Sequence, residues 1–264
     1  MKNPIFLLST GRTGTKYFSN FFSTYGVDVA SYHTTSFTRL LNVLGNMYYH
    51  KLLSKNLMRT IWKRLKHQEI QAHDFTYIES NPYYYNMIDI ISDVFPGAKF
   101  VFIVRLPKSF IISHIKWERQ RWQSMIANRL VPFWQPTSYL NQIKGFNNDY
   151  HQRVEFYSKI WVNKNTAMLG DIAKNDNATV LKFEEVFHPQ NGIQVMVRLV
   201  KWLNISLVQQ ITSEMITAKI NITNNVENNW WDNHCTEIVN EYCSSLMEEF
   251  EYSTCPRRIS PNHV

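Results

Sequence analysis

Residues 9–16, Ser-Thr-Gly-Arg-Thr-Gly-Thr-Lys, combine glycines, cations and hydroxyl side chains directly after a short apolar run that predicts a buried strand. Gly11 and Gly14 allow the backbone to approach an anion, and Arg12 and Lys16 add charge-assisted hydrogen bonds. A strand, a tight glycine turn and a helix together direct backbone N–H groups at a phosphate. The stretch therefore predicts a phosphate loop. The alternative is an ordinary strand-to-helix turn at the edge of a core.

The loop differs from the Walker A motif, which requires Gly, four residues and then Gly-Lys-Ser/Thr. Gly14 is followed by Thr15 and Lys16 in the opposite order, and the residue five positions before Gly14 is Ser9 rather than glycine. This order disfavours a nucleotide kinase or NTPase, which remains the alternative enzyme class.

A second pair of polar residues follows the most apolar predicted strand, at 99–104. Arg105 comes directly after this strand, and Ser113 follows eight residues later inside a predicted helix at 109–122. Together they could hold a second phosphate, the arginine by a forked ion pair and the serine by its hydroxyl. The alternative is an arginine paired with a helix C-terminus and an ordinary helical serine.

Strands and helices alternate along the chain, which predicts an α/β fold of three α/β/α layers around a mostly parallel central sheet. We expect strands at 5–8, 27–31, 75–78, 99–104 and 179–183, and helices at 37–68, 84–95, 109–122, 152–173, 192–203 and 235–250. Without repeats or low-complexity linkers, we expect a single domain over 1–264. Residues 34–74 and 118–150 are the expected acceptor-site or lid insertions.

The composition favours a globular protein with an anionic ligand. Of the 264 residues 44% are hydrophobic and 14% aromatic, and the net charge is +7. Three cysteines without CxxC spacing disfavour a disulfide framework or a zinc site and favour a reducing compartment. No signal-peptide pattern and no apolar run near 18 residues is visible, so we expect a cytoplasmic protein without a membrane partner.

The stretch 51–66 is rich in lysine and arginine. It is most simply a solvated basic helix face, but it could also face an acidic acceptor. A third class of function follows from it: a non-enzymatic binder of nucleic acid or another anionic polymer.

Taken in order, these segments resemble the sulfotransferases that use 3′-phosphoadenylyl sulfate (PAPS), and the resemblance covers most of the chain. Residues 11–15, Gly-Arg-Thr-Gly-Thr, are similar to the family's 5′-phosphosulfate loop. Residues 95–114 resemble its 3′-phosphate segment. Residues 180–185, Val-Leu-Lys-Phe-Glu-Glu, resemble a later strand that usually ends in Tyr-Glu-Asp/Glu.

The resemblance implies a P-loop NTPase-like sulfotransferase fold. It implies transfer of a sulfuryl group from PAPS to a hydroxyl or amine of a small-molecule or saccharide acceptor, with release of PAP. No metal and no nucleic-acid partner is expected. The family's 5′-phosphosulfate contacts correspond to Gly11, Arg12, Thr13, Gly14, Thr15 and Lys16, with Arg12 on the bridging oxygen. Its 3′-phosphate contacts correspond to Arg105 and Ser113, and its adenine contacts to Tyr17 and Phe183, which could equally be core residues.

The attacking acceptor must lose a proton, so a general base should lie within hydrogen-bond reach. His33 follows the second predicted strand, where many carbohydrate and tyrosine sulfotransferases carry a glutamate, and a neutral histidine can act as a base near pH 7. Glu79, at the end of the third strand, is the second candidate. His73 and His114 are weaker ones. We prefer His33, whose alternative is an ordinary surface histidine.

The chain departs from the family pattern at two places. Ser80 stands where many members have a basic residue, so Lys16 or Lys108 would have to substitute for it. The Arg-Lys-Gly segment of cytosolic members is absent, and Lys219 and the loop at 221–231 are its nearest equivalents.

Overall fold

The computed structural model describes residues 3–138, 142–143, 149–217 and 230–252. The chain forms two compact units. The first comprises Met1–Arg105 and Ala167–Ile222, and the second comprises Leu106–Thr166 and Thr223–Val264. The single-domain interpretation and the two insertions stay predictions.

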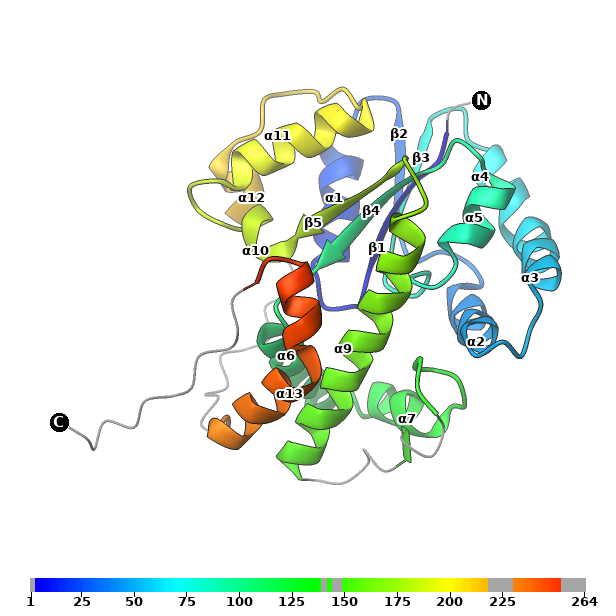
Figure 1. Ribbon diagram of the computed structural model, residues 1–264. Helices are drawn as coiled ribbons and strands as arrows, with labels where there is room; N and C mark the ends of the chain where they lie inside the picture. Colours follow the sequence, from blue (N-terminus) through cyan, green and yellow to red (C-terminus); the bar gives the residue numbers. More distant parts are fainter. Residues whose placement is uncertain (1–2, 139–141, 144–148, 218–229, 253–264) are drawn as a thin grey trace. The chain divides into compact units, whose positions relative to one another are not determined.

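The first unit contains a parallel sheet of five described strands in the order β2-β3-β1-β4-β5 (Figure 1). The strands are β1 Ile5–Ser9, β2 Val29–His33, β3 Thr76–Asn81, β4 Lys99–Val104 and β5 Ala178–Lys182. Their parallel arrangement confirms the expected α/β class. It also brings the carboxyl ends of all five strands to one edge of the sheet, where parallel sheets bind their ligands.

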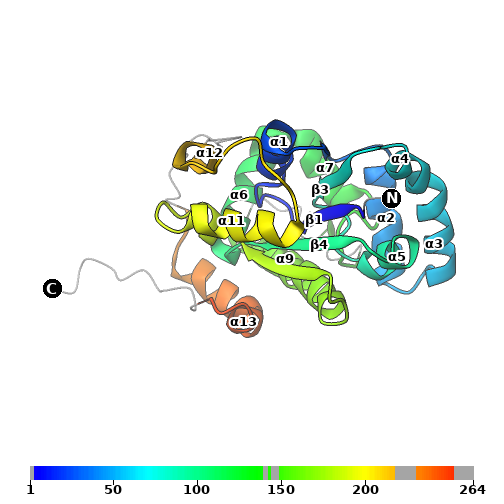
Figure 2. The same cartoon turned by 90° about the horizontal axis from the view of Figure 1, so that it is seen from above.

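Helices cover both faces of this sheet. One face is covered by α1 Thr15–Tyr25, α10 Phe183–Val186, α11 Gly192–Leu203 and α12 Ser213–Thr217. On the other side of β1 lie α2 Thr38–Tyr49, α3 Lys55–Trp62, the π-helix η1 Lys63–His67, α4 Gln68–Gln71 and α5 Ile88–Val94 (Figures 1 and 2). Alternate residues of β1 face opposite sides of the sheet. Ile5 and Leu7 belong to the core that contains α1 and α11, whereas Phe6 contacts Trp62 of α3.

Two of the expected helices are shorter than the apolar pattern indicated. The helix expected at 37–68 is interrupted after α2, because Lys51 adopts a positive φ of 61° and Ser54 caps a new helix by accepting from Leu57 N. The helix expected at 84–95 begins only at Ile88. Before it, the Asn81 side chain accepts from Tyr83 N and holds the chain in a turn.

The strand ends also lie further along the chain than expected. His33 is the last residue of β2 rather than its successor, and Glu79 lies inside β3, which ends at Asn81. The strand at 99–104 and the helix at 192–203 begin and end at the residues that the sequence predicts.

The second unit contains α6 Pro107–Gln120, α7 Trp122–Leu130, α13 Asn233–Glu249 and the first part of α9 Tyr150–Ile172. Its interior holds a buried carboxylate, Glu118, which pairs with Arg153 at 3.0 Å and accepts from Asn128. Most of the loop expected at 221–231, and Lys219, lie outside the described residues. In the part of the chain that is described, no helix is long and apolar enough to cross a membrane.

Candidate active site

The loop between β1 and α1 has the backbone geometry expected of a phosphate loop. Gly11, Arg12 and Gly14 all have positive φ angles, of 92°, 57° and 77°. Gly11 N donates to Ser9 Oγ at 3.1 Å, which closes the first turn of the loop. Gly14 occupies the N-cap of α1 without a side-chain cap, so the first N–H groups of the helix stay available to a ligand.

Both the φ angle and the close neighbours of residue 14 favour glycine at this position. A Cβ atom at this position would lie 3.2 Å from Phe183 Cε2 and 3.3 Å from Phe187 Cε2. Both phenylalanines belong to the segment after β5, and their rings are 4.6 Å apart. The loop after β1 therefore packs directly against the segment after β5.

Arg105 joins the end of β4 to the same cluster. Its Nη1 donates to the backbone oxygen of Arg12 at 2.5 Å, and its guanidinium lies 4.4 Å from the centre of the Phe183 ring. The structure thus brings together three segments that sequence reasoning singled out separately: the glycine loop, Arg105 and Phe183.

The other candidate residues of the loop, Thr13, Lys16 and Tyr17, have different surroundings. The Thr13 side chain is buried, and its Oγ1 has no hydrogen-bond partner within the described part of the chain. Such a buried hydroxyl is suited to a ligand oxygen or a water molecule. Lys16 is exposed. Tyr17 instead belongs to the core, where it packs against Phe18 and Phe187, and burial raises the pKa of its phenol. This favours the core alternative for Tyr17.

His33 lies against the phosphate loop. Its Nε2 is 3.1 Å from Thr15 Oγ1, and its Nδ1 is 3.4 Å from Thr34 Oγ1. Because the Thr34 hydroxyl donates to the His33 backbone oxygen at 2.6 Å, it can only accept from Nδ1. The hydrogen-bond pattern therefore assigns the proton to Nδ1 and leaves Nε2 as the acceptor facing Thr15.

Burial is the main reason that the pKa of His33 is lowered from its ordinary value of 6.5, and the charge of Lys16 lowers it further. A hydrogen bond with its own backbone and the charge of Glu79 act in the opposite direction. The imidazole is consequently neutral at pH 7, as a general base must be.

Glu79 has a different environment. Its side chain is fully buried, and it accepts hydrogen bonds from Thr35 Oγ1 at 2.9 Å, Tyr77 OH at 2.8 Å and Asn81 Nδ2 at 2.7 Å. Lys66 Nζ lies 3.4 Å from Glu79 Oε2, and it also donates to Thr35. This arrangement ties β3 to the helices that cover it.

The remaining candidates lie elsewhere. Ser113 is a buried residue of α6 in the second unit, so its pairing with Arg105 stays a prediction. His114, also in the second unit, packs between the rings of Phe110 and Tyr157. His73 packs against aromatic rings of the first unit.

Sequence reasoning missed Phe187, Thr34 and the buried Lys66. Phe187 stands four residues after Phe183, one helical turn away, which is the signal that could have identified it.

The fold is that of known sulfotransferases. The chain is similar to the sulfotransferase domain from the curacin biosynthetic pathway (14% identity, 97% of this chain and 99% of that chain, TM-score 0.54). It is similar to the sulfotransferase domain of the Synechococcus PCC 7002 olefin synthase (15% identity, 97% and 98%, TM-score 0.53). It is also similar to sulfotransferase STF9 from Mycobacterium avium (11% identity, 97% and 79%, TM-score 0.54).

At the level of sequence, no protein-family model and no curated protein matches the chain. The structural likenesses show that the chain has the sulfotransferase fold.

Proposed function

We propose that this protein is a PAPS-dependent sulfotransferase that moves a sulfuryl group to a hydroxyl or amine of a small-molecule or saccharide acceptor and releases PAP. The observation that carries the proposal is the joining of the glycine loop, Arg105 and His33 at one edge of the sheet. The sulfotransferase fold supports it.

The donor is held at two phosphoryl groups. The loop amides, the Thr13 hydroxyl and Lys16 bind the 5′-phosphosulfate, and Arg12 lies on the bridging oxygen. Arg105 binds the 3′-phosphate through its guanidinium. The resemblance of the sequence assigns Ser113 to the same phosphate. Phe183 supports the Arg105 guanidinium and contacts adenine.

In the transfer step, the acceptor oxygen or nitrogen attacks the sulfur atom as the bond between sulfur and the 5′-phosphate oxygen breaks. The leaving phosphate gains negative charge, which Arg12 stabilises by its positive charge and the loop N–H groups stabilise by hydrogen bonds. The proton of the acceptor passes to Nε2 of His33. The products are the sulfated acceptor, PAP and a protonated imidazole that returns its proton to water.

The contact between His33 and Thr15 links donor binding to the base. In the free protein the Thr15 hydroxyl donates to His33 Nε2. When a phosphate oxygen is present, this hydroxyl turns to it, because a hydrogen bond to an anion is stronger than one to a neutral imidazole. Nε2 is then free to accept from the acceptor hydroxyl.

The environments of the two candidate bases favour His33 over Glu79. Three hydrogen bonds and Lys66 already occupy the Glu79 carboxylate, and its side chain is fully buried. A proton taken up there would break these contacts. We therefore assign the base to His33 and a positioning role at β3 to Glu79.

A thermal-shift series with PAP, ATP and ADP tests the proposal. We expect PAP to raise the unfolding temperature most, since a ligand at 100 times its Kd adds about 2.7 kcal/mol of stability. Arg105→Ala should abolish the preference for PAP, whereas Arg198→Ala, an exposed arginine of α11, should keep it. Equal shifts with PAP and ADP in the wild type, or an unchanged PAP shift in Arg105→Ala, would contradict the proposal. A labelled sulfate donor then identifies the acceptor class.

A further inference from the structure

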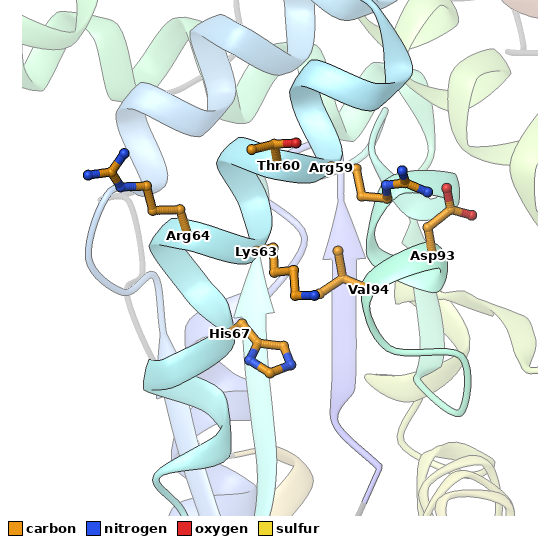
Figure 3. A pocket seen from close by; sticks show the side chains of 7 residues that line it. All are labelled: Arg59, Thr60, Lys63, Arg64, His67, Asp93 and Val94. Carbon is orange, nitrogen blue, oxygen red and sulfur yellow. The ribbon is translucent and has the colours of Figure 1, made fainter.

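A basic groove lies between the α3–η1 helix and the end of α5, within the first unit (Figure 3). The cavity measures about 580 Å³, within the range of pockets that hold small ligands. It is lined by Arg59, Thr60, Lys63, Arg64, His67, Asp93 and Val94. None of these residues belongs to the proposed active site.

The spacing of the buried residues along the helix places its cationic side chains in this groove. Met58, Trp62, Lys66 and Ile70 recur every fourth residue and are all buried, so they fix which side of the helix faces the sheet. Arg59, Lys63 and His67 each follow a buried residue by one position and therefore share the neighbouring face, one turn apart. Figure 3 shows Arg59 and Lys63 extending toward Asp93 and Val94, while the guanidinium of Arg64 points away.

The positive charge of this face is not balanced locally. Asp93 is the acidic residue of the groove, and Lys55 already binds it, with Nζ 3.1 Å from Oδ2. Within the described residues, neither Arg59 nor Lys63 forms an ion pair with a carboxylate. Two like charges one helical turn apart destabilise a helix, so this pair costs stability that a bound anion would restore.

The histidine at the end of the face is held in place. The His67 ring stacks on Phe95, with 5.5 Å between the ring centres and an interplanar angle of 15°. Its Nε2 lies 2.8 Å from Gln71 Nε2. Because an amide nitrogen can only donate, Nε2 accepts, and the neutral ring carries its proton on Nδ1. The η1 segment that contains Lys63 and His67 is a π-helix, a widened turn that is frequent at functional sites.

We propose that this groove binds a compact oligoanion with at least two adjacent phosphate or sulfate groups. Arg59 offers a planar fork for two oxygens of one group, and Lys63 offers a point charge one turn further along. His67 lies one more turn along the same face. The site is separate from the phosphate loop, and the inference does not rest on the proposed sulfotransferase activity.

Isothermal titration calorimetry with sodium tripolyphosphate tests the proposal. In the wild-type protein we expect a binding phase that weakens about tenfold for each cation removed in Arg59→Ala/Lys63→Ala. The matched control is Arg198→Ala/Lys201→Ala, which removes one arginine and one lysine from the exposed face of α11 and should leave this phase unchanged. Equal weakening in both double variants would reduce the effect to net charge and overturn the proposal.

Binding at the loop is resolved by Arg12→Ala, which should remove a loop phase and keep the groove phase. A wild-type titration that shows the groove phase but no loop phase would count against the donor site alone. A heparin-derived sulfated disaccharide, titrated in parallel, distinguishes a sulfated saccharide from a phosphate chain as the source of the anion.

A measurement on the wild type removes dependence on the variants. Tripolyphosphate should shift the backbone amide resonances of residues 59–67 and 93–95. If these resonances stay in place while the loop resonances shift, the groove does not bind the anion.

Discussion

Gly14→Ala is the substitution whose cost the structure defines best. Gly14 has a φ of 77°, and its missing Cβ would fall 3.2 Å from Phe183 and 3.3 Å from Phe187. An L-residue in the left-handed region costs about 1–2 kcal/mol, and overpacking at a tight contact typically adds about 1–3 kcal/mol. We therefore expect Gly14→Ala to lower the free energy of unfolding of the ligand-free protein by about 2–5 kcal/mol.

The matched control is Gly170→Ala. Gly170 lies near the end of α9 in the same unit, and a Cβ there would meet nothing within 4 Å. Because alanine is a better helix former than glycine, this variant should gain about 0.5–1 kcal/mol. Urea unfolding followed by tryptophan fluorescence measures both changes, with the slope of the transition checked for two-state behaviour.

A double-mutant cycle separates the two causes of the Gly14→Ala cost. Phe183→Leu shortens the side chain that the new Cβ would meet, so the combined variant should lose less stability than the sum of the single variants. The part of the stability cost that comes from the positive φ angle at residue 14 should remain in the combined variant. A Gly14→Ala protein as stable as the wild type, or single costs that add without coupling, would refute the packing of the loop against the β5 segment.

Two further predictions concern the candidate bases. Glu79→Ala removes the fully buried partner of Lys66, leaves this lysine with Glu69 at 2.9 Å, and also leaves Tyr77 and Asn81 without their acceptor. It should cost about 3 kcal/mol or more in urea unfolding, against about 1 kcal/mol or less for Glu185→Ala, the exposed partner of Lys182. Equal costs would argue against a buried ion pair. For His33, burial lowers the folded pKa beneath 6.5, so the unfolded chain binds more protons just below pH 6.5 and this group's contribution to stability falls there as the pH falls. Because a protonated imidazole cannot accept the acceptor's proton, kcat/KM for sulfuryl transfer should decline only below pH 6.5. His33→Gln should lose most of this rate and show no such decline in what remains, while the exposed His188→Gln keeps both the rate and the decline. A decline centred above pH 6.5 would contradict the assignment.

The sequence predicts the sheet well because its strands are short apolar runs with clear ends. The strand at Lys99–Val104 lies between Pro96-Gly97 and Pro107, and both of its limits are as predicted. The break inside 37–68 was harder to predict. Apolar residues continue at helical spacing on both sides of it, and the interruption depends on one residue, Lys51, in the left-handed region.

The site was predictable in its parts but not in its contacts. The glycine loop and Arg105 can each be recognised from neighbouring residues in the sequence. The hydrogen bond from the Arg105 side chain to the Arg12 backbone oxygen, however, joins segments 93 residues apart. Lys66 is the clearest error. The basic stretch at 51–66 predicted a solvated face, yet Lys66 is fully buried, because it stands in the four-residue repeat that faces the sheet and pairs with Glu79.

His33 lies beside the loop at the sheet edge and Glu79 is enclosed by helices because side chains alternate between the two faces of a strand. On β3, Tyr77, Glu79 and Asn81 share one face, which the helices α2 to α4 cover, so a carboxylate at this position is directed into a helical layer. His33 is instead the last residue of β2, where the strand ends beside the first turn of α1 and its ring reaches Thr15. One residue at the end of a strand is thus available to a substrate at the sheet edge, while another, two positions before the end of the adjacent strand, is enclosed by the fold. The same rule applied to β4 places Arg105, the first residue after the strand, at that edge and keeps Phe102 and Val104 in the core.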